Sequence, residues 1–311
     1  MNDGGARVRA FDPNKPRRIS AEEVRRVVLE TAVELVNENG LTVSLQHISM
    51  DYIVAAAGVA RSAAYRIWGS RENFFDELLL ELASKPEWAP SVHDPDTLRT
   101  AIRALQEALQ EAPNLLADPA MRRAVVVEMC RTGAKVNYDN VIKRQSWRTY
   151  ITLSATALSY KGPLGAKLQD AIARNEADYV ASMARFYESI GEIVGRRVRA
   201  EFDASADGEP AFSKVAATGS ALMEGLVLRT VTTPEENNMV PDLAPDMKLS
   251  DPFDTGSPQP WSAPAIAFTG MFMAMTEPIP ESEYDLSDLD RKIQVVEEFI
   301  DNLPTPPDHM A

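Results

Sequence analysis

Apolar residues recur every three or four positions over most of residues 20–233, the spacing that places side chains on one face of an α-helix. Ser20-Ala21-Glu22-Glu23 has the pattern of a helix-starting capping box, and Gly40 suits the end of the helix that follows. No convincing alternation of apolar and polar residues, as in a half-buried strand, is present between residues 94 and 233. The pattern predicts an all-α fold.

Between residues 94 and 233 the breaks fall at Pro113, Asp118-Pro119, Gly162-Pro163 and Asp207-Gly208-Glu209-Pro210. They predict helices near 95–111, 118–135, 140–159, 166–201 and 211–232. An earlier helix, capped by Ser70, should run to Lys85-Pro86, because proline cannot continue a helix.

The C-terminal part, residues 234–311, has a different pattern. Residues 234–264 contain seven of the 21 prolines and predict irregular or extended chain. Ala265–Met275 is apolar and much shorter than the roughly 20 residues of a membrane span, and Leu289–Leu303 has one apolar face. Because an exposed apolar segment is unfavourable, we expect this extension to pack on the helices before it or on a partner subunit. A surface for another protein is the alternative.

Residues 53–68 predict two helices joined by a tight turn. Ala55, Ala56 and Ala57 are small enough for a close helix crossing, and Gly58 can adopt the positive φ of a short turn. On the second helix, Ala64, Ile67 and Trp68 should point into the core. The opposite face would expose Arg61, Ser62, Ala63, Tyr65 and Arg66. This arrangement is typical of a helix-turn-helix.

The stretch from Ser20 to Phe75 resembles the DNA-binding domain of the TetR (tetracycline-repressor) family of bacterial transcriptional regulators. The resemblance runs through Glu38-Asn39-Gly40, Ile53 to Val59, Tyr65-Arg66-Ile67-Trp68 and Ser70 to Phe74. Ala60 stands where the family usually has a Ser or Thr cap. The link from Gly40 to Ile53 is a few residues longer than usual, with Val43, Leu45 and Ile48 as extra apolar positions.

The resemblance implies a homodimer that binds a palindromic double-stranded DNA operator and is released by a small-molecule effector, most often as a repressor. It divides the chain into a flexible basic arm (1–19), a helix-turn-helix domain (20–70), a helical regulatory and dimerisation domain (71–233) and the extension (234–311). The DNA-binding residues would be Arg17, Arg18, Ser49, Arg61, Ser62, Ala63, Tyr65, Arg66 and Arg71. An arginine at the start of the recognition helix can reach a guanine edge, and alanine can contact a thymine methyl. The arm could equally be a solubilising tail.

In the regulatory domain, aromatic, Met and Leu side chains of the middle helices could line an effector pocket, or simply form core. The candidates are Met129, Cys130, Tyr138, Trp147, Tyr150 and Leu153. The last two helices match the pair that forms a four-helix dimer bundle in the family, although they could be the core of a monomer. Their interface candidates are Tyr187, Ala217, Ser220, Ala221, Glu224 and Leu228.

A formal net charge of −14 is unusual for a DNA-binding protein, so its distribution matters. Residues 234–311 carry three basic and sixteen acidic residues, whereas residues 1–72 carry ten basic and nine acidic ones. The acidity therefore lies in the extension, and local phosphate contact by the first domain stays feasible. One cysteine, no apolar leader and no membrane-length apolar run favour the cytoplasm, with no membrane partner.

Motifs of catalysis, cofactor binding and metal binding are missing from the sequence: there is no Gly-x-Ser-x-Gly, no phosphate-binding Gly loop and no His-Glu-x-x-His. We therefore predict neither an enzyme nor a metal or cofactor site. Two other functions stay open. One is a helical sensor or protein-binding module that no longer reads DNA, and the other is an all-helical enzyme with a polar pocket.

Overall fold

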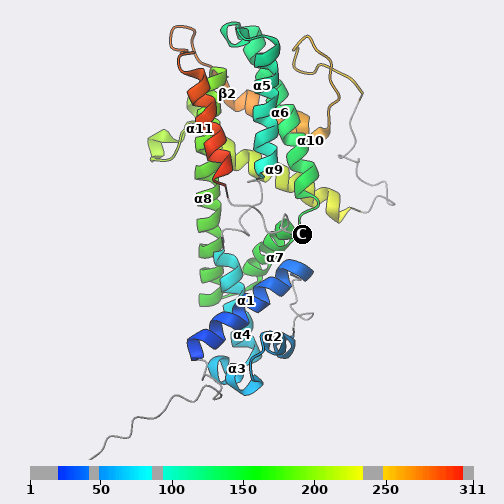
Figure 1. The fold of residues 1–311 in the computed structure, drawn as a ribbon, viewed down its shortest axis with the longest axis vertical. Helices are drawn as coiled ribbons and strands as arrows, with labels where there is room; N and C mark the ends of the chain where they lie inside the picture. The colour runs from blue at the N-terminus through cyan, green and yellow to red at the C-terminus, as the bar shows by residue number, and fades with distance from the viewer. Residues whose placement is uncertain (1–19, 42–48, 86–93, 234–247, 304–311) are drawn as a thin grey trace, which may run out of the picture.

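The predicted all-α fold is confirmed in the computed structural model, which describes residues 20–41, 49–85, 94–233 and 248–303. Four helices gather at one end of the molecule (Figure 1). They are α1 (Ala21–Asn39), α2 (Met50–Ala56), α3 (Arg61–Trp68) and α4 (Arg71–Ser84). Ser20 and Ser70, the predicted capping residues, do start their helices, and each accepts a hydrogen bond from a backbone N–H of the first turn. Ser49, which was not predicted as a cap, does the same for α2.

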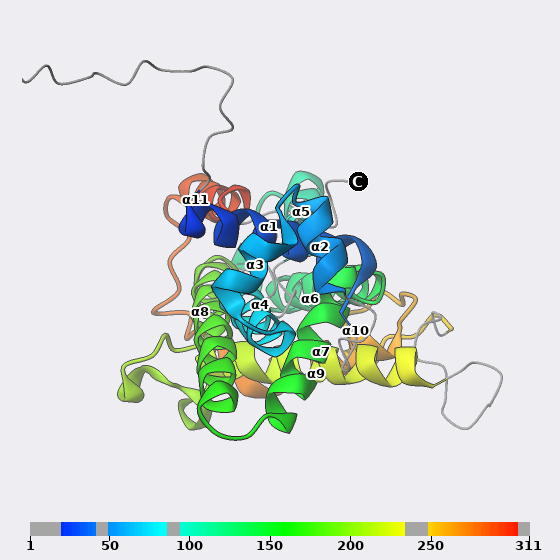
Figure 2. The ribbon, with the colours of Figure 1, turned by 90° about the horizontal axis from the view of Figure 1, so that it is seen from below.

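The larger part of the molecule is built from five further helices and the extension (Figures 1 and 2). The five are α5 (Pro95–Glu111), α6 (Pro119–Val141), α7 (Gln145–Ser159), α8 (Pro163–Val194) and α9 (Ser213–Thr232), with short 3₁₀ turns at Leu115–Ala117, Ala200–Phe202 and Ser205–Asp207. Two boundaries differ from the prediction. The break expected near 135–140 lies at 142–144, and α8 ends at Val194 instead of near 201.

The early end of α8 lies at Gly195. Gly195 adopts φ 64°, which ends the helix, and the next residues form a short strand, β1 (Arg196–Val198), that the sequence did not predict. It pairs antiparallel with β2 (Thr276–Pro278), with Val198 opposite Thr276. A side chain at Gly195 would meet the Tyr284 ring at about 3.1 Å, so both its φ and its surroundings favour glycine.

The extension is part of the core. Residues 248–262 have no helix, as predicted, and α10 (Ala263–Met275) then packs against α6 and α9. Helix α11 (Leu289–Asp301) packs against α8 and α5. Between them, the buried Arg196 guanidinium donates to the Thr276 hydroxyl and carbonyl at 2.8 and 2.7 Å, which ties β2 to the end of α8. The extension therefore covers apolar surface of its own chain.

Two main hydrophobic cores lie along α8. The first joins α1 to α4 with the end of α7 and the start of α8, which contributes Leu168 and Ala171. The second joins α5, α6, α9, α10 and α11 with the later part of α8, including Met183 and Phe186. A helix of 32 residues is about 48 Å long, so one rigid element crosses both cores.

If α11 is an integral part of the second core, removing side chains from its two faces should have different effects. Ile300 is 2% exposed and Val295 is 51% exposed on the same helix. We expect Ile300→Ala to lower the free energy of unfolding by about 2–4 kcal/mol, and Val295→Ala to change it by less than about 0.5 kcal/mol. Urea unfolding followed by circular dichroism measures both, and equal effects would show that α11 is not packed as described.

Candidate nucleic-acid interface and internal cavity

One face of helix α3 packs against the core of the first four helices, and the opposite face points outward. Ala64 and Trp68 are buried, and the Trp68 ring meets Phe74 of α4 edge-on at 5.1 Å between ring centres. The Trp68 indole N–H donates to Glu77 at 2.9 Å, so even the polar atom of this ring is held. As predicted, Trp68 is a core residue, while Ile67 is only half-buried. These contacts set the orientation of α3.

The turn between α2 and α3 follows the predicted geometry, but its packing residues differ. Gly58 has φ 66°, and the Val59 N–H donates to the Val54 carbonyl at 3.1 Å. Ala55 and Ala56 are exposed, so the expected close crossing on small residues is wrong. Ile53 and Val54, which are fully buried, make the contact with the core instead. Alanine occurs both in cores and on surfaces, so the run of alanines did not show which residues of α2 are buried.

The outward face of α3 exposes Arg61, Ser62 and Arg66, whereas Ala63 and Tyr65 are half-buried. The Arg61 guanidinium lies 2.9 Å from a carboxylate oxygen of Asp51 and 5.1 Å from the centre of the Tyr65 ring. The hydrogen bond with Tyr65, and then the charge of Asp51, raise the pKa of Arg61. The exposed face combines a fixed positive charge with hydroxyl groups.

The other predicted DNA-binding residues lie around this face or outside the described residues. The Ser49 hydroxyl accepts from the Tyr52 N–H at 3.3 Å, so it caps α2. Arg71 begins α4, with its guanidinium 5.0 Å from the centre of the Phe75 ring. Ala60 precedes α3 without a side-chain cap. Arg17, Arg18 and the apolar positions Val43, Leu45 and Ile48 fall outside the described ranges.

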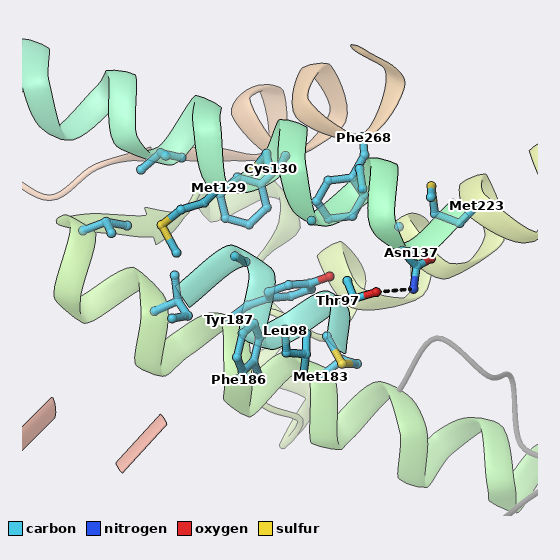
Figure 3. Close-up of a pocket in the computed structure, with 18 residues that line it drawn as sticks. Thr97, Leu98, Met129, Cys130, Asn137, Met183, Phe186, Tyr187, Met223 and Phe268 are labelled. Atoms are coloured by element: carbon cyan, nitrogen blue, oxygen red, sulfur yellow. Dashed lines mark hydrogen bonds between the residues drawn. The ribbon is translucent and has the colours of Figure 1, made fainter. Parts of the chain in front are cut away.

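An internal cavity lies between α5, α6, α8, α9 and α10 (Figure 3). Its volume is about 80 Å³. Aromatic and Met side chains form much of its wall, and Figure 3 shows them converging from several helices. The rings are those of Phe186, Tyr187, Phe268 and Phe272, and the Met side chains are Met129, Met183 and Met223.

Only part of the predicted pocket lies at this cavity. Met129 and Cys130 do line it, and burial raises the pKa of the Cys130 thiol to about 12, so this group is an apolar wall and no reactive thiolate. The other four candidates do not line this cavity. Tyr138 and Trp147 belong to a small core with Met223 and Val227, and Leu153 belongs to the first core. Tyr150 donates to Glu176 at 3.0 Å.

One end of the cavity is polar, because Thr97 and Asn137 line it there. Behind them lies a buried ion pair: Arg144, 4% exposed, donates to Asp94, 0% exposed, at 2.6 Å. Burial would raise the pKa of Asp94, but hydrogen bonds from Asn140 and Thr97 and the charge of Arg144 outweigh it and lower the pKa. Asp94 is therefore a buried, ionised carboxylate whose charge is balanced by the charge of Arg144.

The predicted dimer residues divide into exposed and buried ones. Ala217, Ala221 and Leu228 are exposed on α9, but Ser220 is 2% exposed. Tyr187, which was also expected at the dimer interface, lines the cavity of its own chain. Glu224 is half-buried, in hydrogen-bond contact with Ser220 at 3.4 Å. Its burial, and then the charge of Glu176, raise the pKa of Glu224 to about 7.

Several contributors to the cavity could not be assigned from the sequence. Phe268 and Phe272 lie in the apolar segment that was expected to be buried, but its packing partner was unknown. Asp94 and Arg144 are 50 residues apart, with no motif to connect them. The only usable signal was composition: an apolar, Met-rich run inside an acidic extension.

No protein-family model matches the chain, and comparison with curated proteins and with solved structures likewise finds no match. Within the described ranges, His, Cys, Asp and Glu side chains do not cluster as a metal site would require. In the same ranges, none of the helices combines the length and apolarity needed to cross a bilayer.

The raised pKa of Glu224 predicts a specific pH dependence of stability. Because the folded state holds this proton more tightly than the unfolded state, stability falls as pH rises from about 4.5 through 7. Glu224→Gln should remove this loss, so its gain over the parent protein should be below about 1 kcal/mol at pH 5 and about 2–3 kcal/mol at pH 8. Urea unfolding at the two pH values measures it. The exposed Glu107→Gln is the control, and an equal gain at both pH values would contradict the assignment.

Proposed function

We propose that this chain is a cytoplasmic, TetR-type DNA-binding regulator, acting as a repressor that a small molecule releases from a palindromic operator. The observation that carries the proposal is the position of α3. This short helix has one face held by Trp68 and Ala64, and the other face exposes Arg61, Ser62 and Arg66. An α-helix, about 10–12 Å across, fits the major groove of DNA, which is about 12 Å wide.

The side chains of α3 have the chemistry that base reading requires. Arg61 can present a bidentate donor pair to guanine, and Ala63 can contact a thymine methyl. The Asp51 carboxylate that pairs with Arg61 is exposed, and such a pair is weak in water, so DNA can displace it. Tyr65, next to Arg61, would donate its hydroxyl to a phosphate.

A link between the cavity and the DNA-binding end runs through α8. This helix lines the cavity with Met183, Phe186 and Tyr187, and its Asn175 donates to the Ala83 and Lys85 carbonyls at the end of α4 at 2.9 and 3.3 Å. A ligand that tilts α8 would therefore move α4 and the helix-turn-helix with it. In a dimer, such a movement changes the spacing of the two α3 helices, which must match successive major grooves.

A second candidate function is a helical sensor that does not read DNA. The pairing of Arg61 with Asp51 and the missing side-chain cap at Ala60 favour it. The dependence of binding on salt concentration distinguishes the two functions. For a protein that contacts DNA phosphates, the logarithm of the affinity falls linearly with the logarithm of the salt concentration, because binding releases counterions from the DNA. Binding that is absent, or that does not change with salt, would favour the sensor.

For the DNA-binding proposal, substitutions on α3 should weaken binding to fragments that the parent protein selects from random DNA. We expect Arg61→Ala to lower affinity at least about tenfold and to relax specificity at one base position. Tyr65→Phe should have a smaller effect that is equal on all sequences. Fluorescence anisotropy at several salt concentrations measures both. The control is Arg103→Ala, an exposed arginine on α5; unchanged affinity in both α3 variants would refute the site.

For the homodimer, the exposed face of α9 is the proposed contact. Ala217, Ala221 and Leu228 lie four and seven residues apart, which places them on one side of the helix, and Leu228 is 39% exposed. We expect Ala221→Arg to convert a dimer to a monomer by placing two charges in the contact. Sedimentation velocity measures the mass, with the exposed Glu107→Arg as control. A monomeric parent protein, or an Ala221→Arg protein that stays dimeric, would exclude this interface.

A further inference from the structure

The two helices of the helix-turn-helix share a polar contact on their outward side. Helices α2 and α3 pack against each other at one end of the molecule (Figure 1). The Nε atom of Arg61, on α3, lies 2.9 Å from Oδ1 of Asp51, on α2. The Tyr65 hydroxyl donates to the same oxygen at 3.5 Å, and the Arg61 Cζ atom lies over the Tyr65 ring, 5.1 Å from its centre. A carboxylate and an aromatic ring therefore hold the Arg61 guanidinium from two sides.

The nitrogen that approaches Asp51 is not one that guanine needs. An arginine guanidinium carries five N–H groups in one plane, one on Nε and four on the two Nη atoms. The two Nη atoms can donate side by side to O6 and N7 of guanine. A carboxylate at Nε leaves this pair for the base. Arg61 can therefore keep its contact with Asp51 while it reads DNA.

We propose that Asp51 is a positioning residue for base recognition, whose carboxylate holds the Arg61 guanidinium so that its two Nη atoms face one guanine of the bound DNA. A long side chain loses rotamer freedom when it binds, and a side chain that is already held loses less. Only a base with two acceptors in matching positions benefits from a fixed guanidinium, so the gain is in specificity. This inference deepens the DNA binding of the proposed function and rests on it.

Repulsion between Asp51 and DNA is the competing effect, and it has a different signature. An exposed carboxylate on a DNA-binding face repels phosphates of every sequence, so removing its charge raises affinity without regard to the bases. Loss of positioning instead lowers the discrimination between bases. Measuring affinity for matched and mismatched DNA separates the two effects.

The test is Asp51→Asn, which removes the charge and keeps the size of the side chain. Fluorescence anisotropy measures the affinity of the full chain for a fragment that the parent protein selects from random DNA, and for fragments changed at the base pair where Arg61→Ala relaxes specificity. That base pair should be G·C in the selected fragment. We expect Asp51→Asn to lower the preference for it about three- to tenfold, while affinity for unselected DNA stays the same or rises.

Two further variants make the test specific to the pair. In an Arg61→Ala background, Asp51→Asn should leave the base preference unchanged, because the group that it positions is gone. Glu22→Gln is the matched control. Glu22 is exposed and lines a surface groove together with Arg66 of α3, so this variant removes an equal charge near α3 and leaves Asp51 in place.

A base preference that Asp51→Asn keeps, or that falls equally in Glu22→Gln or in the Arg61→Ala background, would overturn the positioning role and leave the regulator standing. A parent protein that selects no DNA would overturn both. Nitrogen-15 NMR of the Arg61 Nε–H group without DNA is the independent measurement: it should be ordered in the parent protein and mobile in Asp51→Asn. If Asp51→Asn does not fold, as judged by circular dichroism, a mobile Nε–H group in the parent protein still overturns the proposal.

Discussion

The buried pair of Asp94 and Arg144 is the interaction on which much of the larger domain depends. Asp94 caps α5, and Arg144 stands at the junction of α6 and α7, so the pair joins two places that are distant in the sequence. Removing one partner of such a pair would leave an unmatched buried charge, a loss of about 3–5 kcal/mol. The pair also sets the direction of the hydrogen bonds at the cavity. One electrostatic contact thereby joins α5 to the start of α7 and holds Thr97 at the polar end of the cavity.

Most helices were predictable because their determinants are local. The apolar period, the serine caps and the Pro and Gly breaks located α1, α4, α5 and α9 closely. The end of α8 was not predictable in this way. Gly195 could have continued a helix, and only the chain that returns as β2, about 80 residues later, gives β1 a partner. Boundaries that depend on such distant contacts leave no local pattern.

The two candidate sites also differ in how far local sequence patterns could predict them. The exposed face of α3 follows from a short helix with alternating buried and exposed positions, so Arg61, Ser62 and Arg66 could be assigned from the sequence. The cavity needed knowledge of packing. An apolar period says that Trp147, Leu153 and Met129 are buried, but not against which helix, and the first two face other cores. The position of Asn137 at the cavity has no sequence signal, since it depends on how α5 and α6 pack.

The place of α10 in the second core has a consequence for synthesis of the chain. Helices α6 and α9 pack against α10, which is made after them, so the parts of their apolar faces that meet α10 stay uncovered until the ribosome has passed Met275. The antiparallel closure of β1 by β2 comes later still. A chain that stops after Thr232 would display open apolar surface, and chaperones and proteases act on such surface. Closure of the second core therefore has to wait until α10 and β2 have been made.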